Sequence, residues 1–275
     1  MIGRTLTPYL QKHGIAVLAL GSQDLDLLAH GASDRLAALL HRDDALIVLA
    51  GLPPRRGRDL KTMTQNIDMG LAVCTALARQ PVAHIVYMSS DSVYPRTVEE
   101  VTEESPTEPI DDPYSAMHLV RERLFVSLTS TPVSVLRSTQ ICALNDTHDA
   151  YGPNRFRRTA LSENRIVLFG MGEETRDHIM VEDVAAIIYR CLLHQSRGVM
   201  NVATGRSLTF AEVARQVSTH FEPRPEIVRV PRHMPVTHRR FDISVCVRAF
   251  PDLVLTPLEQ GLPRMMQQMA AQREC

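Results

Sequence analysis

Short apolar runs alternate with longer amphipathic segments through most of this chain. The apolar runs are typical of buried strands, and we assign strands to residues 15–20, 45–51, 82–89, 133–138, 165–169 and 199–203. Apolar residues at helical spacing predict helices over 32–42, 60–80, 114–128 and 181–193, the first of them capped by Ser33. This alternation predicts an α/β fold, a doubly wound parallel sheet with helices on both faces.

The composition argues against several classes of partner and site. A formal net charge of −1 gives no overall attraction to nucleic acid or to a membrane surface, so we expect neither as a partner. No apolar run approaches the roughly 20 residues that span a bilayer. The five cysteines are scattered without CxxC pairs, and His148 is far from His178, so we expect no metal. Scattered cysteines and an N-terminus unlike a signal peptide predict a cytoplasmic location.

The alternation becomes less regular from about residue 143, where proline and arginine are more frequent. We therefore expect two structural parts. Residues 1–142 would form the sheet-containing core, to which 165–203 would contribute further strands and a helix. Residues 143–164 and 204–275 would form mainly a smaller C-terminal substrate lobe.

Ligands of such sheets bind at the carboxyl ends of the strands, where Ser90 lies. Tyr114 follows Asp-Asp-Pro, a sequence that suits the first turn of a helix, and it could act as an acid–base group. His118 lies one turn further on the same face, but histidine, with a pKa of about 6.5, is mostly neutral at pH 7. Two other interpretations stay open here: serines 89–92 that only cap a turn, and a tyrosine that only packs at a helix start.

Two basic segments have alternative interpretations as well. Arg176 stands in a glycine-containing loop before a helix, where an arginine suits bidentate phosphate binding. The cluster RRGR at 55–58 follows a strand and could contact a cofactor phosphate. A solvated surface loop explains either segment without a ligand.

These segments together resemble the extended short-chain dehydrogenase/reductase family, the NAD-dependent epimerase/dehydratase group. IGRTL resembles the end of its GxxGFIG opening, SSDSVY resembles SSxxVYG, and YSAMH resembles YxxxK except at its last residue. LRSTQ resembles LRxxN, and GMGEETRDHIMVEDVA resembles the RDxxxVxD segment. The match runs through nearly the whole chain in the order of the family.

The resemblance implies a Rossmann-like core that binds NAD or NADP, and a lobe that binds a nucleotide-sugar. It assigns catalysis to Ser90, Tyr114 and His118. It implies substrate contacts for Ser90, Gln140 and Arg176. The residues that it assigns to the cofactor are Gly3, Asp26, Leu49, Ala50, Gly51, Asn66, Tyr114 and His118.

The sequence departs from the family at two points. Histidine replaces lysine at 118, and the first strand with most of the glycine-rich loop is missing before Gly3. We expect either a start that is late relative to the functional gene product or a diverged member that binds cofactor poorly. Three hypotheses follow: an NAD(P)-dependent enzyme acting on a nucleotide-sugar, a non-catalytic binding protein of the same fold, and a remnant without a ligand. Asp24 and Asp26 favour NAD slightly over NADP, and the helices over 60–80 and 114–128 would allow a homodimer.

Overall fold

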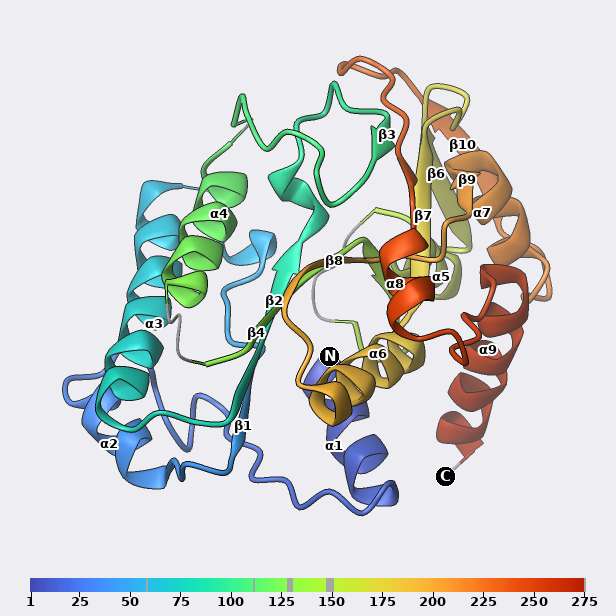
Figure 1. The fold of residues 1–275 in the computed structure, drawn as a ribbon. Coiled ribbons are helices and arrows are strands. Elements are labelled where there is room, and N and C mark those ends of the chain that lie inside the picture. Colours follow the sequence, from blue (N-terminus) through green and yellow to red (C-terminus); the bar gives the residue numbers. More distant parts are fainter. Residues whose placement is uncertain (58, 111, 128–130, 147–150, 275) are drawn as a thin grey trace.

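The computed structural model describes residues 1–57, 59–110, 112–127, 131–146 and 151–274, with all their side chains except those of Arg55 and of 270–274. Four parallel strands form the central sheet, in the order β1-β2-β4-β8 (Figure 1). They are β1 (Ala45–Val48), β2 (His84–Ser90), β4 (Val133–Ser138) and β8 (Gly198–Val202). Each matches a strand expected from the sequence, with bounds that differ by a few residues at most, and the α/β prediction is confirmed.

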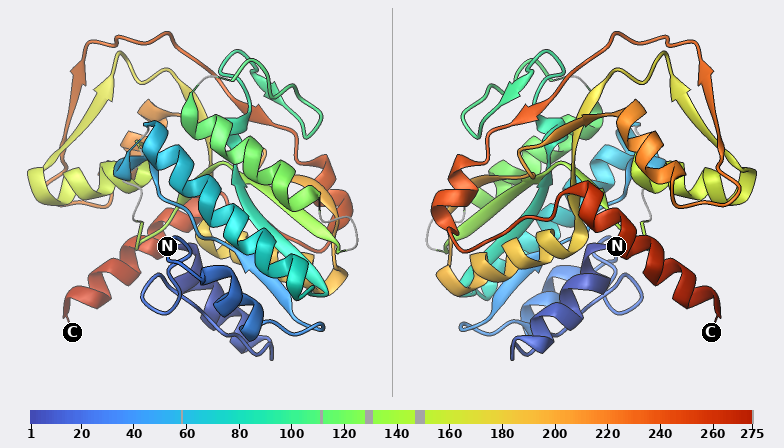
Figure 2. Two further views of the ribbon diagram at one scale, coloured as in Figure 1. Left: turned by 90° about the vertical axis from the view of Figure 1, so that its left-hand side faces the viewer. Right: turned by 90° about the vertical axis from the view of Figure 1, so that its right-hand side faces the viewer.

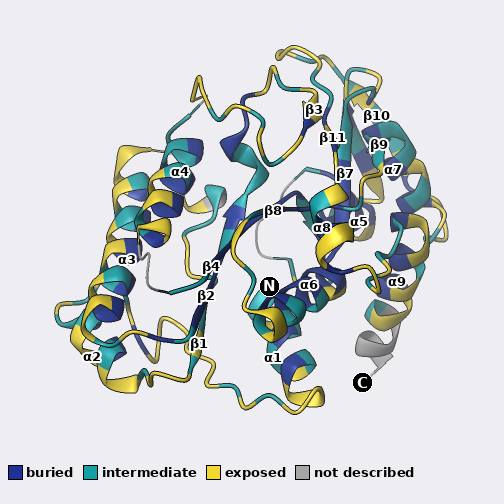
Figure 3. Cartoon of the chain, in the orientation of Figure 1, coloured by how far each residue is buried: buried dark blue, intermediate teal, exposed yellow. Residues whose placement is uncertain are grey.

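Helices cover both faces of this sheet (Figure 2). On one side are α2 (Ala32–Leu39), α3 (Leu60–Arg79) and α4 (Pro113–Val126), and on the other are α1 (Ile2–Lys12) and α6 (Val181–His194). Successive side chains of each strand point to opposite faces of the sheet, so they pack alternately against the two layers of helices. On β2, Ile85 and Tyr87 pack with α3 and α4, whereas Val86 packs with α1 and α6. Figure 3 shows the resulting buried centre between exposed outer helix faces.

The second part of the molecule is built from short strands and helices around its own apolar cluster. One sheet has the order β5-β7-β9, with β5 (Gln140–Cys142), β7 (Thr175–Met180) and β9 (Ser207–Thr209). Two further pairs are β6 (Arg165–Phe169) with β10 (Glu226–Val230), and β3 (Glu100–Val101) with β11 (Arg240–Phe241). The helices around this cluster are α5 (Pro153–Glu163), α7 (Phe210–Ser218) and α9 (Leu258–Glu274). Helix α8 (Ser244–Ala249) packs on β8 of the central sheet, and two 3-10 turns, η1 (Pro54–Arg56) and η2 (Asp91–Val93), follow β1 and β2. Of the strands expected within 165–203, only β8 joins the central sheet, because β6 pairs with β10 instead.

The strand expected at 15–20 was wrong. These residues have no regular structure, and Leu18 and Leu20 are 68% and 41% exposed. A strand is stabilised by hydrogen bonds to a neighbouring strand, and in the described part of the chain β1 is an edge strand with a partner on one side alone. The apolar pattern has another cause, because Ile15 and Val17 pack against the cluster that α1 and α6 share.

The expected cap of the helix at residue 32 was also wrong. The N-cap of α2 is Gly31, in a left-handed conformation with φ 73°, and no side chain caps the helix. Within the described ranges, no helix is long and apolar enough to cross a membrane.

Candidate functional site

The loop after β1 is fixed by two buried side chains. Asn66, 1% exposed on α3, accepts a hydrogen bond from Leu52 N at 2.7 Å and donates to the Leu52 carbonyl at 3.4 Å. Arg121, also 1% exposed, donates from Nη2 to the Ala50 carbonyl at 2.7 Å. The segment of Leu49, Ala50 and Gly51, assigned to the cofactor by resemblance, therefore has a backbone position that does not depend on a ligand.

Arg121 was not among the predicted site residues. Its guanidinium carbon lies 5.2 Å from the centre of the Tyr87 ring, a cation–π contact in the core. It lies seven residues after Tyr114 and three after His118, so all three residues share one face of α4. That spacing is the signal that would have indicated Arg121.

Tyr114 lies at the start of α4, as the sequence predicted. Asp112 is the N-cap of this helix, and its carboxylate accepts from Ser115 N at 2.9 Å. The rings of Tyr114 and His118 meet edge to face, with centres 4.7 Å apart and planes at 81°. His118 is buried, and its Nδ1 lies 3.2 Å from the hydroxyl of Tyr87. Burial raises the pKa of Tyr87 above its usual value, so this hydroxyl keeps its proton.

Ser90 ends β2, and its Oγ accepts a hydrogen bond from Ser92 N at 3.2 Å. The turn-capping interpretation of this serine cluster is therefore correct for Ser90, whatever else its hydroxyl does. Helix α4 packs against both β2 and η2, so the turn that carries Ser90 and the start of α4 belong to one packed unit at the carboxyl edge of the sheet.

A buried ionic network lies beneath this edge. Arg137 on β4 forms a forked ion pair with Glu122 on α4, with nitrogen–oxygen distances of 3.0 and 2.7 Å. Arg137 also donates to the hydroxyl of Tyr94 at 3.1 Å, and that hydroxyl donates to Asn201 on β8 at 2.7 Å. Ser89 donates to the same Glu122 carboxylate. The network ties three strands and α4 together through side chains.

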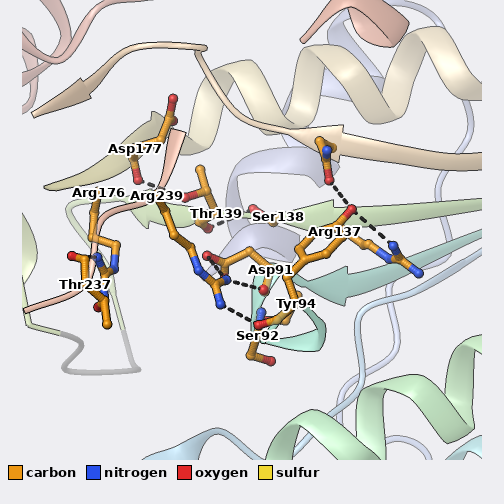
Figure 4. Close-up of polar contacts among 12 residues, drawn as sticks. Asp91, Ser92, Tyr94, Arg137, Ser138, Thr139, Arg176, Asp177, Thr237 and Arg239 are labelled. Carbon is orange, nitrogen blue, oxygen red and sulfur yellow. Dashed lines mark hydrogen bonds and ion pairs between the residues drawn. The ribbon is translucent and has the colours of Figure 1, made fainter. Parts of the chain in front are cut away.

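A second tie joins the turn after Ser90 to the other part of the molecule (Figure 4). Arg239 precedes β11 and donates to the backbone carbonyls of Asp91 and Tyr94. Its guanidinium also lies 3.5 Å from the Asp91 carboxylate. Burial raises the pKa of Asp91, and the charges of Arg239 and Arg176 oppose that rise.

Arg176 has several partners within the protein. It donates to Glu174 Oε1 at 2.7 Å, to the Thr237 hydroxyl at 2.7 Å and to the Thr237 carbonyl at 2.8 Å. Its backbone neighbour Asp177 points to the opposite side of β7 and accepts hydrogen bonds from the turn after β8. Arg176 is therefore an ordered residue of a polar cluster and not part of a solvated charged loop.

Gln140 begins β5 directly after the central strand β4. Its register partner on β7 is His178, and its Oε1 has no hydrogen-bond partner in the described chain. Gln140 therefore lies beside the strand that carries Arg176.

The remaining cofactor residues lie in two different environments. Gly3, in the first turn of α1, is close to the loop after β1, since a Cβ built on it would lie 3.7 Å from Leu49. Asp26 is in an exposed turn, where its carboxylate accepts from Leu28 N at 2.9 Å. No described strand connects this turn to the sheet.

The basic segment RRGR lies partly in the short turn η1 after β1. Pro54–Arg56 form η1, Arg56 is exposed, and Arg58 lies outside the described residues. The part of the chain that the structure describes contains no cluster of metal-ligating side chains. His148 lies outside it.

Comparison with known proteins gives a family and a fold. A family model described as the NAD dependent epimerase/dehydratase family matches residues 1–203. The dTDP-L-rhamnose 4-epimerase of Burkholderia thailandensis is 26% identical over 149 residues, which are 48% of this chain. The match spans only 39% of the length of that relative.

Two solved structures have the same fold. One is an NAD-dependent NDP-hexosamine 5,6-dehydratase, TunA, with a TM-score of 0.83, 21% identity and coverage of 98% of this chain and 95% of its own. The other is RMD from Pseudomonas aeruginosa complexed with NADPH, with a TM-score of 0.82, 24% identity and coverage of 97% and 94%. At these identities the likeness establishes the architecture.

Proposed function

This chain belongs to the NAD-dependent epimerase/dehydratase family, and from that membership we propose that it catalyses hydride-transfer chemistry on a nucleotide-sugar, with Tyr114 as the acid–base group. The observation that carries the proposal is the contact of Tyr114 with His118 at the start of α4, a helix packed on the strand that Ser90 ends. The similar proteins act on dTDP-L-rhamnose and on an NDP-hexosamine, which supports a nucleotide-sugar as substrate.

In this proposal Tyr114 takes the proton from a substrate hydroxyl or returns it, and Ser90 hydrogen-bonds the same oxygen. His118 lacks the permanent charge of a lysine. The buried guanidinium of Arg121 supplies a permanent positive charge on the same helix face, one turn further along. In the tautomer in which the hydroxyl of Tyr87 donates to Nδ1 of His118, the proton of a neutral His118 is on Nε2. His118 would use that N–H toward a ribose hydroxyl.

The described residues fit one half of a dinucleotide better than the other. The backbone of Leu49–Gly51, held by Asn66 and Arg121, and the pair of Tyr114 and His118 suit the ribose and nicotinamide part. Bound there, a nicotinamide would supply a hydride acceptor or donor. On the adenosine side, Asp26 already accepts a local hydrogen bond from Leu28 N, which a ribose hydroxyl would have to share or replace.

The predicted diphosphate contact of Arg176 needs a revision. Its guanidinium is committed to Glu174 and Thr237, so a phosphate would have to replace one of these internal acceptors. Gln140 is the better-placed candidate for a substrate contact, since its amide oxygen is buried and unused among the described residues.

The experiment compares the wild-type protein with Tyr114→Phe. We expect NAD or NADP to raise the thermal midpoint of both, because this substitution leaves the loop after β1 intact. Turnover over a panel of nucleotide-sugars should fall by about 10²-fold or more in Tyr114→Phe. Tyr189→Phe, which removes a phenol on α6 across the sheet, is the matched control and should retain turnover. Equal turnover in Tyr114→Phe and the wild type would refute the assignment.

A non-catalytic binding protein is the second candidate, and histidine at 118 favours it. Ligand binding without turnover in the wild type would support it. The variant His118→Lys sharpens the test, because it restores the charge that the family pattern places there. Turnover that appears only in His118→Lys would mean that the fold has kept its site and lost the cation.

We also propose a homodimer through α3 and α4. These packed helices expose apolar side chains, among them Leu60 and Leu71 on α3 and Val120 and Val126 on α4. Leu71→Glu should convert the dimer to a monomer in light scattering, and a wild-type monomer would contradict the proposal. A cytoplasmic location stays a prediction.

A further inference from the structure

One face of β7 carries a buried histidine beside two residues already assigned to the substrate. Side chains two positions apart on a strand lie on the same face, so Arg176 and His178 share one face of β7. Gln140 is the register partner of His178 on the parallel strand β5, and it lies on that face as well. His178 is therefore a neighbour of both Gln140 and Arg176 on this face.

His178 is 2% exposed, and neither of its ring nitrogens has a hydrogen-bond partner among the described residues. The Oε1 atom of Gln140 has none either. Such groups are rare in folded proteins, because a buried polar atom without a partner costs free energy. The two strands thus place one unused acceptor and one unused imidazole side by side.

Both groups converge on Gly152. A Cβ built on Gly152 would lie 3.1 Å from Gln140 Oε1 and 3.2 Å from His178 Cε1. Gly152 has φ +127°, a conformation that other residues rarely adopt, and it precedes α5 without any side-chain cap. A side chain at this position would crowd both polar residues, so the glycine lets Gln140 and His178 lie close together against the backbone at the start of α5, with Phe210 beside them.

The charge state of His178 defines what it can bind. Burial, and to a smaller extent the charge of Arg176, lower its pKa to about 3. The ring is therefore neutral at physiological pH, with one N–H donor and one nitrogen acceptor. A hydroxyl group complements this pair of residues, since it can accept from the imidazole and donate to the amide oxygen of Gln140.

We infer that His178 and Gln140 together bind a hydroxyl group of the sugar in the substrate. The inference rests on the proposed function, which supplies a nucleotide-sugar. His178 then determines specificity, because it contacts the sugar of the substrate and not the nucleoside diphosphate. A histidine that only fills the core is the competing explanation, but a phenylalanine beside Phe210 would fill that space without two unused polar atoms.

The test measures the affinities of UDP, UDP-glucose, dTDP and dTDP-glucose by calorimetry. The variants are His178→Phe, which keeps a ring without nitrogens, His178→Asn, which keeps a donor and an acceptor, and Gln140→Leu. The matched control is His84→Phe. His84 is 1% exposed at the start of β2, with Nε2 2.9 Å from the Ser196 carbonyl, and it is remote from the carboxyl edge.

We expect the wild type to bind a sugar conjugate more tightly than the corresponding nucleoside diphosphate. His178→Phe and Gln140→Leu should each lower the affinity for the conjugate about tenfold. The double variant should lower it by less than the product of the two effects, because both side chains bind the same hydroxyl. Affinity for UDP or dTDP should stay unchanged. His178→Asn should retain part of the preference, and His84→Phe should lower the thermal midpoint while it keeps the preference.

Two kinds of result would overturn the inference. In the first, the wild type binds the conjugates, and the variants His178→Asn, His178→Phe and Gln140→Leu show the same preference over the nucleoside diphosphates as the wild type. His178 is then a core residue, and the proposed function survives. If the wild type binds a conjugate and its nucleoside diphosphate with equal affinity, His178 is again a core residue and the proposed function survives. If the wild type binds none of the four probes, the proposed function is itself wrong and the inference is lost with it.

Discussion

The loops after β1 and β2 and the segment of residues 15–31, which contains Asp26, are held in place in different ways. The loops after β1 and β2 are tied by buried side chains from distant parts of the chain, such as Arg121 to Ala50 across 71 positions and Arg239 to Asp91 across 148. The turns within residues 21–31 are held by local hydrogen bonds, in which Asp24 and Asp26 bond backbone groups two or three positions away, while Ile15, Val17 and Leu25 pack against the apolar clusters. Long-range polar ties fix the backbone of a loop relative to the sheet, whereas local hydrogen bonds fix only the shape of their own turn.

The largest expected effect comes from the network beneath the tied region. Arg137→Met would leave the Glu122 carboxylate buried without its counter-charge, and we expect a loss of about 3–5 kcal/mol in the free energy of unfolding. Equilibrium denaturation in urea measures it. The control is Arg240→Met, an exposed arginine paired with Glu99 and Glu100, which should leave the denaturation midpoint nearly unchanged. Similar losses in both variants would contradict the distinction between buried and exposed ties.

A somewhat smaller loss is expected when the loop after β1 is released. Arg121→Ala removes a large buried side chain and leaves the Ala50 carbonyl without its donor, at a cost of about 3 kcal/mol. Arg123→Ala, an exposed position on the same helix, is the control. If Arg121→Ala unfolds at the same denaturant concentration as Arg123→Ala, the loop is held by something other than this arginine.

Two neighbours on β7 are expected to give opposite pH dependences. Burial raises the pKa of Asp177 from 3.8 to about 6, so its folded form keeps a proton that the unfolded chain releases, and stability falls as pH rises through this range. Burial lowers the pKa of His178 from 6.5 to about 3, so the unfolded chain binds the extra proton and stability falls as pH drops below 6.5. The two slopes nearly cancel in the wild type.

Single variants should expose these slopes. Relative to the wild type, Asp177→Asn should gain about 2 kcal/mol of unfolding free energy between pH 4 and pH 6, and His178→Phe should lose about as much over the same interval. Denaturation at a series of pH values separates this slope from the constant cost of each substitution. If the pH profiles of both variants run parallel to that of the wild type, neither group titrates as its burial implies.

The smallest effect is expected in the locally held region. Leu18 is 68% exposed, so Leu18→Ser should change the unfolding free energy by less than about 0.5 kcal/mol. Leu10→Ser, at a buried position of α1, is the contrasting variant and should destabilise strongly. A large loss of unfolding free energy in Leu18→Ser would show that the Leu18 side chain is buried in solution, and it would remove the contrast between the two regions.

The sequence was most informative where structure depends on local pattern. VSVLRS was predicted as a strand over 133–138, and β4 has these bounds, with all six residues buried between the two helix layers, the polar Ser134, Arg137 and Ser138 included. IAVLAL has a similar pattern but forms no strand, because pairing depends on a partner elsewhere in the chain. Tyr114 was recognised from its place after Asp-Asp-Pro, and its helix begins there.

The parts of the site that the sequence did not indicate act through distant contacts. Arg239 lies in a segment noted only for its prolines and arginines, yet it holds the turn after Ser90. His178 was considered only as a metal ligand, because the identity of its neighbour Gln140 depends on the register of two short strands. Arg121 was also missed, although its helical spacing from Tyr114 would have placed it on the same face of α4.

The bridge from Arg239 to Asp91 also bears on the order of events during synthesis. A ribosome delivers residue 91 long before residue 239, and contacts between positions so far apart form late in folding. The sheet from β1 to β8 is complete once residue 202 has emerged, but the turn that carries Ser90 still lacks its tie at that moment. A nascent chain would therefore hold an assembled sheet with an unfinished candidate site until residue 239 arrives.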